Sequence, residues 1–115
     1  MGDTIESKAV TEIEGVPTFG TFFVKPMLVG ARMSMLKVRL ERGVRSQMHT
    51  HSHESLIYVV SGALKAVVGE QNLVLRQGEA CRHPENVAHS VEALEDTLFV
   101  EVKAPVPQLQ TTLGI

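Results

Sequence analysis

Residues 56–68, LIYVVSGALKAVV, consist of two apolar runs separated by the pair Ser61-Gly62. Both runs are rich in β-branched residues and Leu, and both are too short for the helices of a βαβ unit. Glycine tolerates the positive φ of a tight turn, so consecutive antiparallel strands are expected to pair here. The stretch therefore predicts a β-hairpin.

The same pattern of short apolar runs continues outward along the chain. The further runs are FGTFFV (19–24), MSMLKVRL (33–40), LVL (73–75) and TLFVEV (97–102). The pairs Gly69-Glu70 and Gln77-Gly78 predict two more turns between paired strands. In residues 33–40 the methionines fall out of phase with the other apolar positions, which predicts a bulge or a strand buried on both faces. An all-β barrel or sandwich follows.

Composition excludes several classes of protein. The 115 residues suit one domain, and 43% hydrophobic with 21% charged residues is typical of a globular core. A net charge of −2 without a basic stretch argues against nucleic acid as a partner. One cysteine cannot form an intrachain disulfide, and no apolar leader or membrane-length segment occurs. We expect a cytoplasmic protein that binds neither nucleic acid nor membrane.

Three of the five histidines are clustered, and this cluster is the main chemical signal. They occupy positions 49, 51 and 53, in the stretch HTHSH. In an extended chain, side chains two residues apart share a face, so His49 and His51 can bind one divalent metal. A third ligand would come from a strand brought near by folding, and His89 is the best candidate. The alternative is a polar surface loop that happens to contain three histidines.

Wider spacing in the sequence resembles the two signature motifs of the cupin superfamily. The positions that carry the resemblance are Gly43, His49, His51 and Gly62 in the first motif, and Gly78, Pro84 and His89 in the second. The segments HTHSHESLIYVVSG, PENVAHSV and ALEDTLFVEVKAP are similar to the small single-domain cupins of pectin and alginate (uronate) degradation.

The resemblance implies a fold and a site. The fold is an all-β, antiparallel, jelly-roll-like cupin barrel of six to eight or more strands, open at one end. The site is one divalent transition metal ion, Zn, Mn, Fe or Ni, held by His49, His51 and His89. An acid matching Glu101 lines the cavity in these cupins and serves as a general acid or base, whereas strand alternation alone predicts that Glu101 and Lys103 are solvated.

The sequence departs from the family pattern at several positions. Ser55 stands where cupins usually carry a Glu or Gln ligand, and Glu54 is one residue early, which would turn its carboxylate to the other face. Water, His53 or a local shift of Glu54 could complete a metal site, or no metal binds. The aromatic residue that uronate-processing cupins carry is Lys103 here, and their arginine near Pro107 is missing.

Two more residues lie next to this site in the sequence. We expect His83 to be a neutral, hydrogen-bonded histidine or an exposed strand end, with an extra ligand or an acid/base as the alternative. Cys81 is expected to be a small core residue rather than a nucleophile.

The chain divides into residues 1–18 as an N-terminal arm, 19–105 as the cupin barrel and 106–115 as a C-terminal tail. Gly20–Val24 contains two adjacent phenylalanines that need burial. We expect this segment to pair with a second subunit in a homodimer.

Three functions follow from the site. The first is a metal-dependent enzyme for a small sugar acid or keto acid, acting by isomerisation or ring opening of an unsaturated uronate. A metal-dependent dioxygenase is a related possibility, because an open facial ligand set can bind O₂. The third is a non-catalytic, small-ligand-binding or degenerate cupin. In each case the expected partner is a small molecule.

Overall fold

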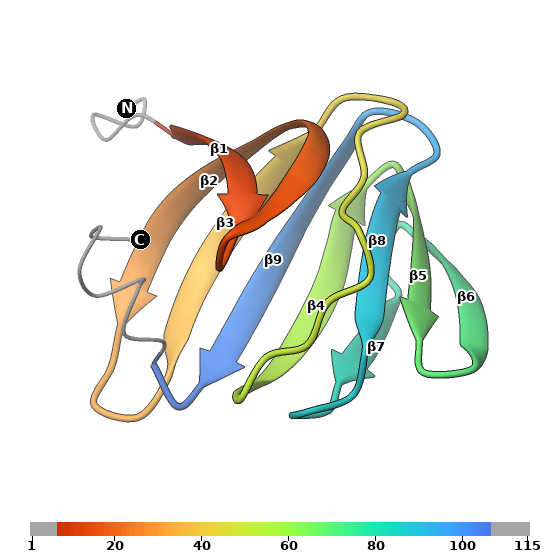
Figure 1. Cartoon of the computed structure of the whole chain (residues 1–115). Helices are drawn as coiled ribbons and strands as arrows, with labels where there is room; N and C mark the ends of the chain where they lie inside the picture. Colours follow the sequence, from red (N-terminus) through yellow and green to blue (C-terminus); the bar gives the residue numbers. More distant parts are fainter. Residues whose placement is uncertain (1–6, 107–115) are drawn as a thin grey trace.

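The computed structural model describes residues 7–106, and these form nine β-strands and no helix (Figure 1). The expected all-β class is therefore confirmed. The strands are β1 (Lys8–Ile13), β2 (Val16–Val29), β3 (Ser34–Leu40), β4 (Glu54–Ser61), β5 (Ala63–Val68), β6 (Gln71–Arg76), β7 (Ala80–His83), β8 (His89–Ala93) and β9 (Thr97–Ala104). Within these residues there is no long apolar helix that could cross a membrane.

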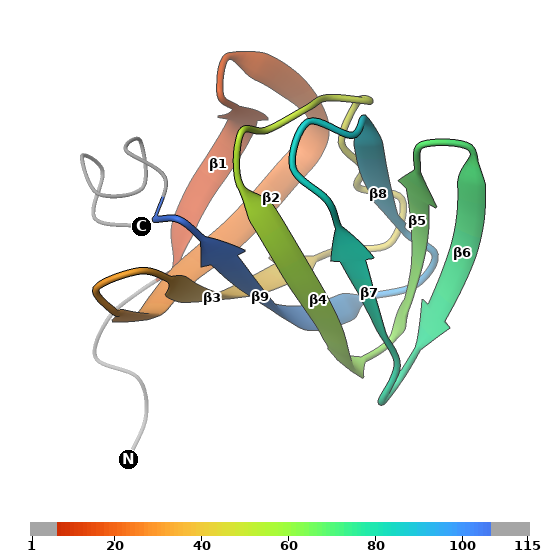
Figure 2. The same cartoon turned by 90° about the horizontal axis from the view of Figure 1, so that it is seen from below.

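The strands form two antiparallel sheets that curve around one interior (Figure 2). A six-stranded sheet has the order β1-β2-β3-β9-β4-β7, and a three-stranded sheet has the order β6-β5-β8. The last strand, β9, therefore lies between β3 and β4, far from its sequence neighbours. The core between the sheets contains large apolar side chains, including Phe22, Leu36, Ile57, Leu64 and Phe99.

The side chains of β3 alternate regularly between the inner and the outer face, and this explains why the methionines are out of phase with the other apolar residues. Leu36, Val38 and Leu40 are buried, whereas Met35 is 37% exposed on the outer face. The expected bulge, or burial on both faces, is therefore wrong for this strand. The register shift lies instead in its partner β2, between Pro26 and Leu28.

Only one of the three predicted turns joins paired strands. Gly69-Glu70 connects β5 to β6, which pair as expected. Ser61-Gly62 and Gln77-Gly78 carry the chain from one sheet to the other, so the hairpins predicted there are wrong. Gly62 is required at its corner, because its φ is +92° and an added Cβ would lie 2.3 Å from the Asp96 carbonyl oxygen.

The N-terminal segment belongs to the sheet. Residues 8–18, which we assigned to an arm, form β1 and the start of β2. Phe23 pairs with Ala9 on one side and Arg39 on the other, so both edges of the segment around it are occupied within the chain. The predicted strand pairing of Gly20–Val24 with a second subunit is therefore wrong. Residues 107–115 of the expected tail lie outside the described residues.

Candidate metal centre and its pocket

Folding brings together the three histidines that the sequence analysis selected. His49 and His89 face each other across an isolated β-bridge, with N···O distances of 3.0 and 2.9 Å. His51 follows two residues after His49, and the ring centroids of His51 and His89 are 5.1 Å apart. One ligand atom from each of the three histidines lies within 4.8 Å of the others. The arrangement can hold one metal ion.

Hydrogen bonds orient two of these imidazoles for metal binding. His49 donates its Nδ1–H to the carbonyl of Gln47 at 2.7 Å, and His89 donates its Nδ1–H to the carbonyl of Val87 at 3.1 Å. Each ring is held by a backbone oxygen two residues earlier in the chain. The lone pair is then on Nε2, which is the nitrogen free to bind a metal.

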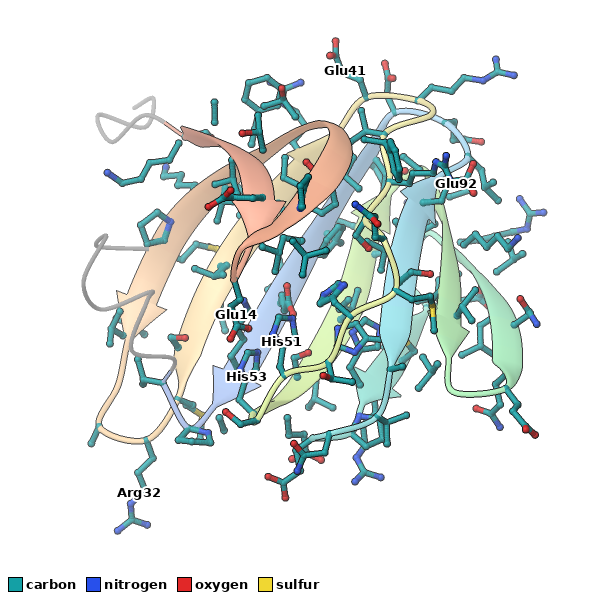
Figure 3. The ribbon with its side chains drawn as sticks, viewed as in Figure 1. Glu14, Arg32, Glu41, His51, His53 and Glu92 are labelled. Atoms are coloured by element: carbon teal, nitrogen blue, oxygen red, sulfur yellow. The ribbon has the colours of Figure 1, made fainter. Side chains whose placement is uncertain are left out.

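The third imidazole is oriented by a carboxylate. Glu14, at the turn between β1 and β2, accepts a hydrogen bond from Nδ1 of His51 (Figure 3). Both turn residues have positive φ, 48° at Glu14 and 84° at Gly15, as in a tight two-residue hairpin turn. The sequence analysis missed Glu14 because it placed these residues in an arm. The Glu-Gly pair before the apolar segment was the available signal.

Burial keeps the imidazoles of His51 and His89 neutral. Burial, with smaller contributions from His53, Lys103 and His89, lowers the pKa of His51 to about 3. Burial and the neighbouring His83 likewise lower the pKa of His89 to about 4. Neutral imidazole is the form that binds a metal, and divalent first-row metals accept such nitrogens. The donor set therefore fits a divalent transition metal.

Ser55, which stands where the cupin pattern usually carries a Glu or Gln, lies inside the barrel. Ser55 is 1% exposed. Glu54 points outward, where its carboxylate pairs with Nε of Arg82 at 2.6 Å. The possibility that Glu54 completes the metal site is therefore contradicted, as the alternation of an extended strand predicts.

His53 lies beside the three-histidine set. Its ring stacks on that of His51 with centroids 4.4 Å apart, and it forms a second possible metal-binding group with His51 and Glu14. Burial, with Lys103, lowers the pKa of His53 to about 4. It is buried, and its Nε2 has no hydrogen-bond partner among residues 7–106.

His83 differs from what the sequence analysis favoured. It is only 2% exposed, and neither ring nitrogen has a hydrogen-bond partner in the described part of the chain. The expectation of a hydrogen-bonded or exposed histidine is therefore wrong. Its ring stacks on that of His89, with centroids 4.2 Å apart. The side chain is a buried polar group at the site to which the described residues offer no hydrogen bond.

The last strand contributes both of its charged residues to the pocket. Glu101 and Lys103 line it together with the histidines and the core residue Phe99. The expectation from alternation, that both are solvated, is wrong, because the face that carries Phe99 is the inner one. Burial opposes ionisation of Glu101, but Lys103, His83 and the Ser55 hydroxyl outweigh it and lower the pKa of Glu101. Its catalytic role stays a prediction.

Cys81 matches its expected role as a small core residue. It packs partly buried against the core cluster. Burial, with the nearby Glu101 carboxylate, raises the pKa of its thiol to about 11, so the reactive thiolate is scarce at neutral pH.

Comparison with known proteins identifies the family. The model of the cupin domain matches residues 36–102. The chain belongs to the cupin family. The described residues form one small cupin barrel. A search of curated proteins found none that matches this chain.

Solved structures agree with this assignment. KdgF from Halomonas sp. has a TM-score of 0.74 and 25% identity, over 77% of this chain and 83% of that one. A predicted oxalate decarboxylase from Thermotoga maritima has a TM-score of 0.78 and 16% identity, over 90% and 95% of the two chains. An RmlC-like cupin from Shewanella frigidimarina has a TM-score of 0.73 and 19% identity, over 89% and 86%. The last two show the fold alone.

Proposed function

We propose that this cupin holds one divalent transition metal ion through His49, His51 and His89 and acts on a small sugar acid or keto acid. The reaction class is isomerisation or ring opening of the unsaturated uronate type. One observation carries the proposal. Three imidazoles, two of them buried and that of His49 half-buried, converge with ligand atoms within 4.8 Å, in a pocket that Glu101 and Lys103 also line.

His49, His51 and His89 would hold the divalent metal, which when bound would supply Lewis-acid polarisation of a carbonyl or hydroxyl oxygen of the substrate. His51 and His89 serve this by staying neutral, and all three rings are kept fixed by the hydrogen bonds from Nδ1. Zn, Mn, Fe and Ni all accept imidazole nitrogen, so the ligand set suits each of them.

Glu101 is the residue that we assign to proton transfer. Its lowered pKa keeps the carboxylate ionised at neutral pH, which is the state of a general base. It lines the same pocket as the histidines, so a substrate carbon or hydroxyl next to the polarised oxygen would lie near it. Lys103, in the same pocket, carries the positive charge that an acidic substrate needs.

The test is elemental analysis of the purified protein, reloading with single metals, and an assay on unsaturated galacturonate. We expect turnover only in the metal-loaded protein, and a loss of about 100-fold or more in Glu101→Gln, since general acid–base catalysis contributes ~10²–10⁴. Glu95→Gln, on an exposed bend before β9, is the matched control. Ligand binding without turnover would contradict the enzyme and favour the small-ligand-binding alternative.

We also propose that the chain is a homodimer, through a different surface from Gly20–Val24. Cross-strand pairing aligns Leu28, Met35, Val102 and Leu56 on the outer face of the six-stranded sheet. Leu28 and Leu56 are 69% and 52% exposed, so a second copy covering this row would bury apolar surface. Sedimentation velocity at tens of micromolar tests this, and a strictly monomeric species would contradict it.

A further inference from the structure

Three polar side chains lie in one row across the wall of the pocket. Ser55 on β4 is directly opposite His83 on β7 and directly opposite Lys103 on β9. Neighbouring strands are about 4.8 Å apart, so the row spans roughly 10 Å between its outer Cα atoms. His83 and Lys103 line the pocket, and Ser55 is buried between them. The row is long enough for a small organic acid.

Two members of this row are buried polar groups that are incompletely satisfied within residues 7–106. Neither ring nitrogen of His83 has a hydrogen-bond partner there, and the Ser55 hydroxyl has only the Glu101 carboxylate, whose pKa it lowers. Leaving such a group unsatisfied costs about 1–3 kcal/mol. A neutral imidazole offers one donor and one acceptor, and a serine hydroxyl offers both. A ligand hydroxyl, which also donates and accepts, can pair with one ring nitrogen of His83 and with the Ser55 hydroxyl.

His83 is better placed for an organic ligand than for the metal. The ligand atoms that lie within 4.8 Å of one another belong to His49, His51 and His89, and His83 is outside this set. It is nevertheless adjacent, because its ring stacks on that of His89. A group bound at His83 would therefore lie next to the metal-binding nitrogens.

Lys103 places a positive charge at the other end of the row. It is half-buried and forms no direct ion pair among the described residues, although its charge acts on the Glu101 carboxylate and lowers the pKa of that group. The rest of the lining is largely apolar, with Phe22, Leu36 and Ile57 among its members. A cation in such surroundings attracts an anionic group strongly, because the local dielectric is low.

We propose that His83, Ser55 and Lys103 form a subsite for a small hydroxy acid, with its carboxylate at Lys103 and a hydroxyl at Ser55 and His83. This inference rests on the proposed function and deepens it. It names the ligand as an acid that carries hydroxyl groups, and it orients the molecule from β9 towards β7, beside Glu101.

The carboxylate end is tested by calorimetric titration of the metal-loaded full chain with D-galacturonate and with neutral D-galactose. We expect wild type to favour galacturonate. Lys103→Met should weaken galacturonate binding about tenfold and leave galactose binding unchanged, whereas Lys103→Arg should keep the preference. The matched control is Lys65→Met, which removes a half-buried lysine of β5 that does not line the pocket.

The hydroxyl end is tested with Ser55→Ala and His83→Leu. Both variants should weaken galacturonate and galactose binding several-fold and in equal proportion, because both sugars carry hydroxyl groups. Metal affinity, measured by competition with a chromophoric chelator, should stay at the wild-type value. Ser55→Ala removes one atom only, so it keeps the test valid if His83→Leu does not fold.

Equal binding of both sugars by wild type, unchanged galacturonate binding in Lys103→Met, no binding at all, or loss of metal in His83→Leu would each overturn the subsite. Galacturonate binding with the expected variant pattern, but no turnover of unsaturated galacturonate, would contradict the proposed enzyme and leave the subsite standing. The two failures are thus distinguishable.

Discussion

The paired strands β4 and β9 have an apolar end and a polar end. At the apolar end, Val59 and Phe99 are directly paired and are 0% and 2% exposed. At the polar end, the same inner face carries Ser55, Glu101 and Lys103. Strand alternation turns all five side chains inward, but only the apolar ones gain free energy from burial alone. The apolar end stabilises the fold, whereas the polar end is retained at a cost that the proposed ligand would offset.

The largest expected effect is on the polar end. Replacing both His49 and His51 by Ala should abolish metal binding and leave the fold intact, since two of three imidazole ligands are lost. Elemental analysis measures the metal, and circular dichroism checks the fold. His53→Ala is the matched control and should keep the metal, because His49, His51 and His89 suffice to hold it. Unchanged stoichiometry in the double variant would refute the ligand assignment.

Truncating a side chain at the apolar end should lower the stability of the fold, whereas the double variant at the polar end should lose the metal and keep the fold. Phe99→Ala should lower the free energy of unfolding by about 3–5 kcal/mol, because it removes a fully buried ring from the core. Glu101→Gln, one inward position along the same strand, should change the free energy of unfolding by less than about 1 kcal/mol. Urea unfolding measures the free energy of unfolding of both variants. Equal losses would show that the two ends do not differ in this way.

A smaller effect, on metal affinity, is expected from changing Glu14 in the turn between β1 and β2, which contacts His51 at the polar end. Glu14→Ala should weaken metal affinity about 10–100-fold, because His51 loses the carboxylate that orients its ring. Glu14→Gln keeps an oxygen acceptor and should retain most of the affinity. Glu12→Ala, an exposed neighbour that also lines the pocket, should have no effect. Chelator competition provides the affinities, and a wild-type value for Glu14→Ala would contradict the role.

The last effect concerns the pH dependence of stability in the metal-free protein. In the folded, metal-free protein the pKa values of His51, His53 and His89 are lowered to about 3, 4 and 4. The unfolded chain binds protons near pH 6.5, so stability should fall as pH drops from 7 to 5. We expect the melting temperature to drop by about 4 °C or more over this range. Thermal unfolding with a chelator present tests this, and His51→Gln should reduce the slope.

The sequence by itself determined the fold class, the family and the three central histidines. Short apolar runs bounded by glycine specify strands, because period-2 burial and turn chemistry are local properties. His49 and His51 share a face for the same local reason. The expected orientation of Glu54, outward and away from the metal site, followed from alternation and is confirmed by its contact with Arg82. Of the cupin resemblance, the fold and the family are confirmed.

The tertiary structure alone decided which faces and which strands meet. Glycine tolerates both a hairpin turn and a corner between sheets, so the sequence could not reveal that Gly62 carries the chain to the other sheet. Alternation gives two faces but does not say which is inner, and the pairing of β9 between β3 and β4 placed Lys103 in the pocket. Glu14 reaches His51 across 37 residues of sequence. Such contacts depend on long-range packing, which no local pattern encodes.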